Sequence, residues 1–312
     1  MVRAYGKNGV EMTYPVDSSE LLQAAWIDLV EPTEDEREAI RPLVRHGLAL
    51  EEDADEIESS VKSFVDAVGV HVSTLFLHDV AGQPENTNVA VIVTADRLIT
   101  MHDRDIPVIR LLHRRVRRRP TLLTDPMGLL LELFETAIED LGDELQDLYR
   151  DLEETSRLVL EDETADLKDA LDRLARHENL NGKLRLCLMD ARRDLAFVLR
   201  SSQPGKLQAK RLKRLLSDID ALLPHNNHLF ERVNFLLQAA QGFINIEQNQ
   251  IIKIFSVAAV VFLPPTLIAS IYGMNFQHMP ELYWLIGYPL SLGLMVISAV
   301  LPYLFFKRKG WL

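Results

Sequence analysis

The stretch IFSVAAVVFLPPTLIASIYGMNFQHMPELYWLIGYPLSLGLMVISAVLPYLFF, residues 254–306, decides the architecture of this chain. Residues 254–272 and 284–306 carry no charge, and the two stretches contain 19 and 23 residues. Each is long enough for a helix to cross a hydrocarbon core of about 30 Å. The connection, residues 273–283, is too short to form a domain. We therefore expect a hairpin of two transmembrane helices.

Basic residues flank this hairpin on one side of the membrane only. Lys253 precedes the first span, and Lys307, Arg308 and Lys309 follow the second, whereas the only charged residue of the loop is Glu281. The positive-inside rule places both termini in the cytoplasm. Two helices cannot enclose a hydrated pore, so conduction requires several copies. The alternative is a hairpin that serves only as an anchor.

The chain before the spans has the composition of a cytoplasmic protein. Charged residues are dense up to about Lys253, and the formal net charge of the 312 residues is -12. The N-terminus has no apolar core of signal-peptide length, and the single cysteine, Cys187, excludes an intrachain disulfide. We therefore expect an inner-membrane protein with a large cytoplasmic part. An acidic surface argues against nucleic acid as a partner and suits cations.

Residues 1–120 have the pattern of a mixed α/β domain. A strand is expected at residues 25–30, and Thr33 with Glu36 has the spacing of a capping box that starts a helix. Further strands are expected at residues 69–77, 88–94 and 98–102, the last two forming a hairpin. A short helix after Pro107 should end in an arginine run before Pro120. We interpret that run as a solvated helix face or as a partner of the acidic helices.

Residues 121–224 have the spacing of long helices with an acidic outer face. A break near residues 161–164 predicts two antiparallel helices. Another helix should start near Lys206 and be interrupted at Pro224, which cannot continue the backbone ladder. The chain then divides into a stalk helix with the first span at 225–272, a periplasmic loop at 273–283, the second span at 284–306 and a basic tail at 307–312.

The sequence contains none of the common enzymatic motifs: no phosphate-binding loop, no dinucleotide fingerprint, no His-Glu-x-x-His and no nucleophile elbow. We therefore expect a protein that is not an enzyme. Without a nucleotide site, transport should be passive. Two charges that move inward through about 100 mV release roughly 4.6 kcal/mol, which is sufficient.

The first span ends in Tyr272-Gly273-Met274-Asn275-Phe276, and Met279-Pro280-Glu281-Leu282 follows in the loop. Here the chain resembles the CorA family of magnesium channels, whose signature is a Gly-Met-Asn at the outer end of the first of two C-terminal spans. The likeness extends to residues 245–257, 262–266 and 302–312, and upstream to residues 26–32 and 133–136, which resemble members of the enterobacterial type. It covers nearly the whole chain.

The resemblance implies a funnel-shaped homopentamer with a pore that is lined by the first span. It further implies that Gly273, Met274 and Asn275 form the ion-selectivity site, with Mg²⁺ as cargo. A related branch that carries zinc shares the Gly-Met-Asn. The Met-Pro-Glu-Leu loop favours the magnesium branch and leaves passage of cobalt or nickel open.

The side chain of Asn275 suits the ion. Magnesium gives up its water reluctantly, so a neutral ring of amide oxygens would hold the hydrated ion and still release it. The alternative is an ordinary helix C-terminal asparagine. Glu281 would either draw cations to the mouth or pair with a loop neighbour.

One face of the first span is expected to line the pore. Its members recur at steps of three or four: Asn249, Ile252, Phe255, Ala259, Leu263, Thr266 and Ser270. The apolar stretch from Ile252 to Leu263 could gate by dewetting. The alternative is a helix-packing seam, which the small residues Ala259 and Ser270 would also suit.

The excess acidity suggests that the cytoplasmic part senses Mg²⁺. Carboxylates that face each other between subunits repel, and a bound divalent ion would remove that repulsion and favour a closed state. The candidate residues are Asp218 and Asp220, close to the stalk, and the alternative is a solvated acidic face. Two other functions stay open: a zinc or broad divalent-cation transporter on the same scaffold, and a membrane-anchored scaffold whose acidic helices bind a partner.

Overall fold

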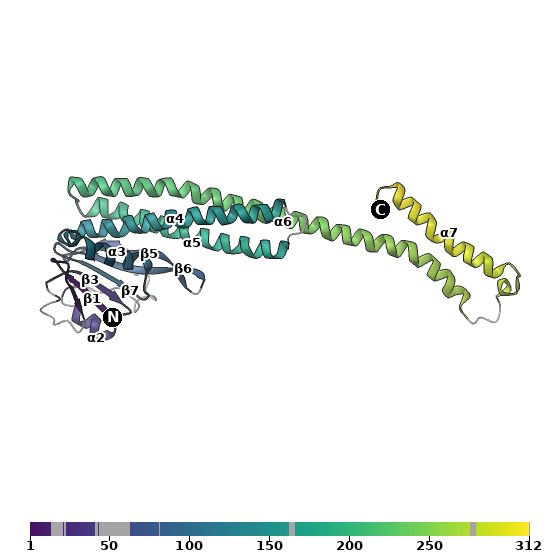
Figure 1. Ribbon diagram of the computed structural model, residues 1–312, viewed down its shortest axis with the longest axis horizontal. Helices are drawn as coiled ribbons and strands as arrows, with labels where there is room; N and C mark the ends of the chain where they lie inside the picture. Colours follow the sequence, from purple (N-terminus) through teal and green to yellow (C-terminus); the bar gives the residue numbers. More distant parts are fainter. Residues whose placement is uncertain are drawn as a thin grey trace. The chain divides into compact units, whose positions relative to one another are not determined.

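The computed structural model describes residues 1–13, 21, 23–40, 43, 63–80, 82–161, 166–274 and 279–311. Its Cα atoms group into two compact units, Met1–Leu237 and Gln238–Leu312. Figure 1 shows the ribbon with the element labels used below. The long helix α6, Lys206–Tyr272, contributes its first part to one unit and its last part to the other.

The first unit is built on a mixed sheet. The strands are β1 Val2–Gly6, β2 Glu11–Thr13, β3 Ala24–Val30, β4 Ser63–Val65, β5 Val70–Val80, β6 Gln83–Val93 and β7 Leu98–His102. In the described residues their order is β2-β1-β3-β7-β6-β5-β4. Only β3 and β7 pair in parallel, with Trp26 opposite Leu98; the other pairs are antiparallel.

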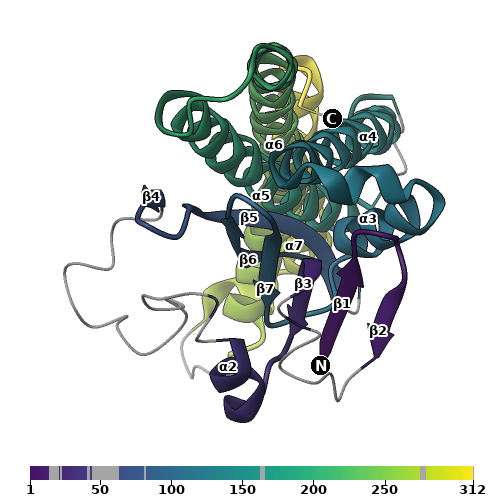
Figure 2. The ribbon, with the colours of Figure 1, turned by 90° about the vertical axis from the view of Figure 1, so that its left-hand side faces the viewer.

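Helices cover the sheet on both faces (Figure 2). The short helix α2, Glu34–Ile40, lies on one face, where Ile27, Leu29 and Ile40 join a buried apolar cluster. The opposite face carries α3 Pro107–Arg118, α4 Pro126–Leu160 and α5 Leu167–Ser201. This alternation follows from strand geometry, since successive side chains of β3 point to opposite faces.

A carboxylate of α5 protects the edge of the sheet. β4 pairs with β5 over Val70–Val72, and the backbone N–H of Leu75, beyond that pairing, donates to Asp190 Oδ2 at 3.1 Å. Nearby, Ser63 Oγ donates to Asp194 Oδ1 at 3.0 Å and so fastens β4 to α5. The edge of β5 is therefore held by side chains of a helix as well as by a strand.

Most local predictions are confirmed. The capping box forms, with Thr33 N donating to Glu36 Oε2 at 3.0 Å and Glu36 N donating to Thr33 Oγ1 at 3.4 Å. The hairpin of β6 and β7 turns at residues 94–97, and α4 and α5 are the expected pair of long helices. The sequence pattern did not predict the short strands β1, β2 and β4.

The predicted interruption at Pro224 is wrong, because α6 continues through it. Buried apolar residues lie on both sides of the proline: Leu215, Ile219, Leu229 and Val233. Beside it, Asn226 Nδ2 donates to the carbonyl oxygen of Asn181 in α5 at 2.9 Å, and Asn181 Nδ2 donates to the carbonyl oxygen of Asn226 at 3.2 Å. Tertiary packing thus offsets the one backbone hydrogen bond that proline removes.

The second unit contains the end of α6, the 3₁₀ turn η4 Pro280–Tyr283 and α7 Gly287–Arg308. By length and composition α6 and α7 are apolar enough to cross a membrane, with mean hydropathies of 2.2 and 1.9 in their most apolar windows. The last turn of α7 carries Lys307 and Arg308, and the ring of Trp311 stacks on Phe306 at 5.5 Å. The second helix begins at Gly287, three residues after the expected start of the span.

Candidate ion pathway

Helix α6 ends immediately before the Gly-Met-Asn motif. The Gly273 N–H closes the last helical turn on the carbonyl of Ala269 at 2.9 Å, and Met274 N bonds to Ile271 O at 3.3 Å. A Cβ on Gly273 would lie 3.1 Å from the Ala269 carbonyl oxygen, which is tight. The close approach of this carbonyl therefore disfavours a larger side chain at position 273.

The mouth contains three further predicted site residues, Met274, Asn275 and Glu281. Asn275 lies outside the described residues, and so does the side chain of Glu281, whose backbone belongs to η4. Met274 is described and half-exposed. The selectivity site therefore stays a prediction, with Gly273 and Met274 placed at the end of a span as expected.

Within the second unit, one face of α6 is less exposed than the rest. Val257 is buried, and Val261, Pro264, Ile268 and Tyr272 follow it at steps of three or four as half-buried residues. Helix α7 has a matching row of buried and half-buried positions with several small residues: Gly287, Ser291, Met295, Ser298, Pro302 and Phe306. We infer that these two rows face each other, since small residues let membrane helices approach closely.

The predicted pore row lies on the other side of α6. All seven of its members are exposed in the single chain: Asn249, Ile252, Phe255, Ala259, Leu263, Thr266 and Ser270. At 3.6 residues per turn, this row is centred about half a turn from the row that faces α7. Helix α7 therefore does not cover it, and the row is available to line a pathway or to contact another chain.

The exposed row is apolar in its middle and polar at its ends. Ile252, Phe255 and Leu263 are 62%, 71% and 65% exposed. Asn249 stands at one end, and Thr266 and Ser270 stand towards the motif. The Thr266 hydroxyl donates to the carbonyl of Phe262 at 2.7 Å, so its oxygen lone pairs remain available to water or to a hydrated ion.

The two predicted regulatory carboxylates are each engaged by an arginine. Asp220 Oδ1 lies 2.7 Å from Arg192 Nε, and Asp218 Oδ2 lies 3.8 Å from Arg214 Nε. All four side chains are about half-exposed or more. Within the described residues, no three histidine, cysteine, aspartate or glutamate side chains lie close enough together to hold a metal ion. Within the described part of the single chain, neither Asp218 nor Asp220 therefore belongs to a group of three such ligands.

Repulsion between carboxylates occurs instead on α4, which sequence reasoning did not single out. Burial and then the charge of Asp143 raise the pKa of Asp140. Burial and then the charges of Asp140, Asp79 and Asp143 raise the pKa of Glu144. Asp79 belongs to the end of β5, so only the folded chain brings it to this cluster. An acidic stripe on a helix was the only sequence signal.

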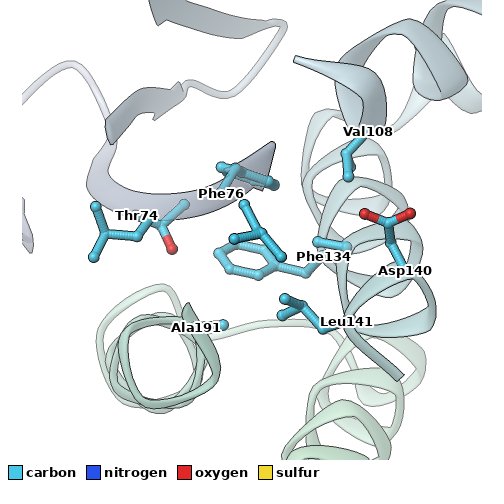
Figure 3. Close-up of a pocket in the computed structure, with 10 residues that line it drawn as sticks. Thr74, Phe76, Val108, Phe134, Asp140, Leu141 and Ala191 are labelled. Atoms are coloured by element: carbon cyan, nitrogen blue, oxygen red, sulfur yellow. The ribbon is translucent and has the colours of Figure 1, made fainter. Parts of the chain in front are cut away.

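A small cavity lies next to this cluster (Figure 3). Thr74, Phe134, Asp140 and Ala191 contribute to its lining, and its volume is about 10 Å³. That is room for roughly one water molecule, and the buried hydroxyl of Thr74 has no hydrogen-bond partner among the described residues. The cavity fits a structural water and is too small for a hydrated cation.

The arginine run of α3 pairs with the acidic helices, as one of the two interpretations predicted. Arg115 bonds to Glu132 at 3.0 Å and to Glu139 at 2.9 Å, both on α4. Arg117 reaches Glu11 of β2 at 2.5 Å. These ion pairs join α3 to its neighbours within the chain and give no reason to expect nucleic acid.

Known proteins show what this arrangement is similar to. The model of the family described as CorA-like Mg2+ transporter protein matches residues 22–308. The magnesium transport protein CorA of Yersinia pseudotuberculosis is 47% identical over 298 residues, which is 95% of this chain and 94% of that protein. The one of Salmonella typhimurium is 46% identical over 308 residues, or 98% of each chain.

Solved structures share the fold at lower identity. The complete CorA magnesium transporter of Methanocaldococcus jannaschii has a TM-score of 0.77 at 20% identity and covers 100% of this chain and 99% of its own. The cytoplasmic domain of ZntB from Vibrio parahaemolyticus has a TM-score of 0.55 at 12% identity, over 70% of this chain and 87% of its own. The match of the family model and the identity over nearly the full length together show that this chain belongs to the CorA family of magnesium transporters.

Proposed function

We propose that this chain is the subunit of a passive Mg²⁺ channel of the bacterial inner membrane. The observation that carries the proposal is the Gly-Met-Asn at the end of α6, directly above an exposed row that α7 does not cover. The identity to magnesium transport proteins over nearly the whole chain supports Mg²⁺ as cargo. Cobalt and nickel are proposed as further cargo.

The exposed row supports assembly into a ring. Ile252, Phe255 and Leu263 are large apolar side chains, and the two spans of one chain cannot surround an ion. Several copies that turn this row inward would enclose a pathway that is narrow and apolar in its middle. A homopentamer is the proposed number, on the resemblance of the sequence to its family. Both termini are proposed to lie in the cytoplasm, because the last turn of α7 carries Lys307 and Arg308.

The proposed selectivity step keeps the hydration shell of the ion. Mg²⁺ dehydrates reluctantly and prefers six oxygens at about 2.0–2.1 Å. A ring of Asn275 amides, with backbone carbonyls near Gly273, would accept hydrogen bonds from the water shell without a formal charge. Such binding is weak enough for release, which conduction requires. The inside-negative potential supplies the driving force, so no ATP is needed.

The proposed regulation uses Mg²⁺ on the cytoplasmic side. A divalent ion that binds the closed state better than the open state shifts the population towards closure. Asp218 and Asp220 are the candidate ligands, and in the single chain they pair with Arg214 and Arg192. Binding of Mg²⁺ would have to compete with these exposed ion pairs, which are typically worth less than about 1 kcal/mol.

Regulation is tested by recording current while Mg²⁺ is raised on the cytoplasmic side. The test variant combines Asp218→Ala with Asp220→Ala. The control variant combines Asp140→Asn with Glu144→Gln and so removes charge from the acidic cluster on α4. Inhibition that shifts to higher Mg²⁺ only in the first pair supports the assignment. A wild-type dose response in that pair would show that these two aspartates are not the sensor.

Transport is tested with the purified chain in proteoliposomes, with Mg²⁺, Zn²⁺ and Co²⁺ offered separately under an inside-negative potential. We expect Mg²⁺ influx that needs the potential and no nucleotide. Influx of Zn²⁺ in preference to Mg²⁺ would favour the zinc or broad divalent-cation transporter. No influx of any ion from a correctly assembled protein would favour a membrane-anchored scaffold.

A further inference from the structure

A buried polar centre lies where β1, β3, β7 and α3 meet in the first unit. We call it the Asp28 centre, and its side chains are all at least 95% buried: Tyr5, Trp26, Asp28, Thr100, His102 and His113. The rings of Trp26 and His113 stack at 4.3 Å. None of these residues belongs to the proposed ion pathway. A buried charge is costly unless it is paired, so the centre requires an explanation.

Asp28 occupies the middle of the centre and is surrounded by hydrogen-bond donors. Its Oδ1 accepts from Thr100 Oγ1 at 2.5 Å and lies 3.0 Å from His102 Nε2. Its Oδ2 lies 2.8 Å from His113 Nε2. An ionised carboxylate only accepts, so these contacts require a proton on Nε2 of both histidines.

His102 differs from His113 in what its second nitrogen meets. The Nδ1 of His102 lies 2.5 Å from the backbone carbonyl oxygen of Arg104, which also only accepts. A neutral imidazole has one N–H, so it would leave a lone pair against either Asp28 or this carbonyl. Two acceptors therefore require two protons, and the geometry assigns His102 as the imidazolium.

His113 is satisfied as a neutral ring. Its Nδ1 lies 3.0 Å from the hydroxyl of Tyr5, which can donate the proton. Trp26 Nε1 donates to Thr100 Oγ1 at 3.1 Å, which completes the network. The Asp28 centre thus holds one negative charge, on Asp28, and one positive charge, on His102.

Charged residues of β1, β2, α3 and the turn before α3 lie around the centre. On β1, Arg3 stands opposite Asp28 in the register with β3. Asp105, in the turn before α3, adds a negative charge near His102. On the Tyr5 side, Arg117 of α3 pairs with Glu11 of β2.

Among the described residues, the other elements packed around the centre bring apolar or already paired side chains. Residues Val89 and Val91 of β6 stand opposite His102 and Thr100 in the register with β7. On α4, Glu132 is engaged by Arg115 and Arg211. The turn η3, Pro120–Thr124, contains no charged residue. The pair of Asp28 and His102 therefore dominates the electrostatics of this site.

The pKa directions agree with the geometry. Burial alone would lower the pKa of His102, but the hydrogen bond and the charge of Asp28 outweigh it and raise the pKa above its ordinary value of 6.5. Burial alone would raise the pKa of Asp28, but the bonds from His102 and His113 hold it well below its usual range. A histidine whose pKa is higher in the folded state than in the unfolded state stabilises the fold at pH values below its unfolded pKa. This contribution to stability is lost as the pH rises through the folded pKa.

We propose that the pair of Asp28 and protonated His102 is a proton-operated lock, which ties β3, β7 and the turn at Arg104 together and opens in an alkaline cytoplasm. The turn leads directly into α3, whose arginines hold α4. When His102 loses the proton on Nδ1, the lone pair of this nitrogen faces the carbonyl oxygen of Arg104, and both groups are acceptors. The fold of this unit therefore becomes less stable as the pH rises above neutrality.

The first test is thermal unfolding of the full chain in detergent between pH 6 and pH 9. For wild type we expect the melting temperature to fall by about 2–4 °C for each unit by which the pKa of His102 is raised. The His102→Gln variant should lack this fall, and His78→Gln, which changes another buried histidine, should keep it. A His102→Gln chain with the wild-type pH dependence would overturn the proposal.

A second measurement needs no variant. In ¹⁵N-histidine spectra of the wild-type chain in liposomes, one of the nine histidines should stay doubly protonated at pH 7.5, with both ring nitrogens in strong hydrogen bonds. If all nine rings are neutral at pH 7.5, the lock does not exist, whatever the stability of His102→Gln.

Discussion

The two parts of α6 belong to one continuous helix but differ in how far their apolar side chains are exposed. Before Leu237 its apolar residues are buried against α4 and α5, as Leu212, Ile219 and Val233 are. After Lys253 the apolar residues of the predicted pore row are exposed, as Phe255 and Leu263 are. Burial of the first set stabilises the fold of one chain. Among the described residues the second set has no such partner, so these side chains are available to lipid, to other copies and to ions.

The first prediction concerns the mouth of the second part. Asn275→Ala should abolish Mg²⁺ influx, because it removes the proposed ring of amide oxygens. Assembly should be unchanged, since one side chain at a loop contributes little to helix packing. Influx is measured in proteoliposomes, and size-exclusion chromatography of the same preparation controls for assembly. Wild-type influx in the fully substituted oligomer would disprove the assignment of Asn275.

The second prediction concerns the apolar middle of the exposed row. Phe255→Ser should raise the basal leak, because a hydroxyl lets water occupy a constriction that otherwise closes by dewetting. Leak is measured with high Mg²⁺ on the cytoplasmic side, the condition in which the proposed regulation closes the wild-type channel. Val257→Ser on the face towards α7 is the matched control and should leave the leak low. Equal leak in both variants would move the gate away from Phe255.

The third prediction makes one substitution in both regions. Leu212→Ala in the first part of α6 should lower the free energy of unfolding by about 2–5 kcal/mol, because Leu212 is fully buried and leaves a cavity. Leu263→Ala should change it by less than about 0.5 kcal/mol in the single chain, since Leu263 is 65% exposed. Denaturant unfolding of the chain in detergent measures both. A large loss at Leu263 in a monomer would contradict the contrast between the two regions.

The fourth prediction concerns a charge on the buried side of the comparison. Burial first, and the charge of Asp190 in addition, raise the pKa of Asp194 to about 6, although Arg193 opposes the shift. From an ordinary value of 3.8 this corresponds to at most about 3 kcal/mol, at roughly 1.4 kcal/mol per unit. Stability from the protonated form is complete below pH 3.8 and lost as the pH passes about 6.

Asp194→Asn should therefore raise the melting temperature at pH 7.5 and flatten its decline between pH 5 and pH 7. The asparagine keeps the acceptor for Ser63 and stays neutral. Thermal unfolding of wild type and variant at pH 5, pH 7 and pH 7.5 measures both changes in melting temperature. A lower melting temperature at pH 7.5 would mean that the ion pair with Arg193 outweighs the cost of burial.

Local signals in the sequence were sufficient for much of the fold. Thr33 and Glu36 are three residues apart, so their capping box could be read directly. The membrane hairpin and its motif were equally local. Pro224 shows the limit of this reasoning, because the intrinsic cost of proline is local whereas the packing that offsets it comes from α5.

The parts that could not be predicted depend on contacts between distant residues. Asp28, His102 and His113 are separated by up to 85 positions, and their spacing gives no sign that they meet. The same holds for Asp79, which joins the acidic cluster of α4 only through folding. That the seven residues of the predicted pore row share one face was predictable, because a single helix fixes their relative positions.

The contact between the Asp190 carboxylate and the edge of β5 bears on how copies of the chain meet in a membrane. Proteins confined to a membrane meet one another often, and an open strand edge invites irreversible pairing with a neighbour's strand. Here the Leu75 N–H that an incoming strand would seek is already occupied by a helix side chain. Pairing of β5 with a strand of another chain is thereby disfavoured. Contacts between chains are then made by helices, and such contacts can be reversed.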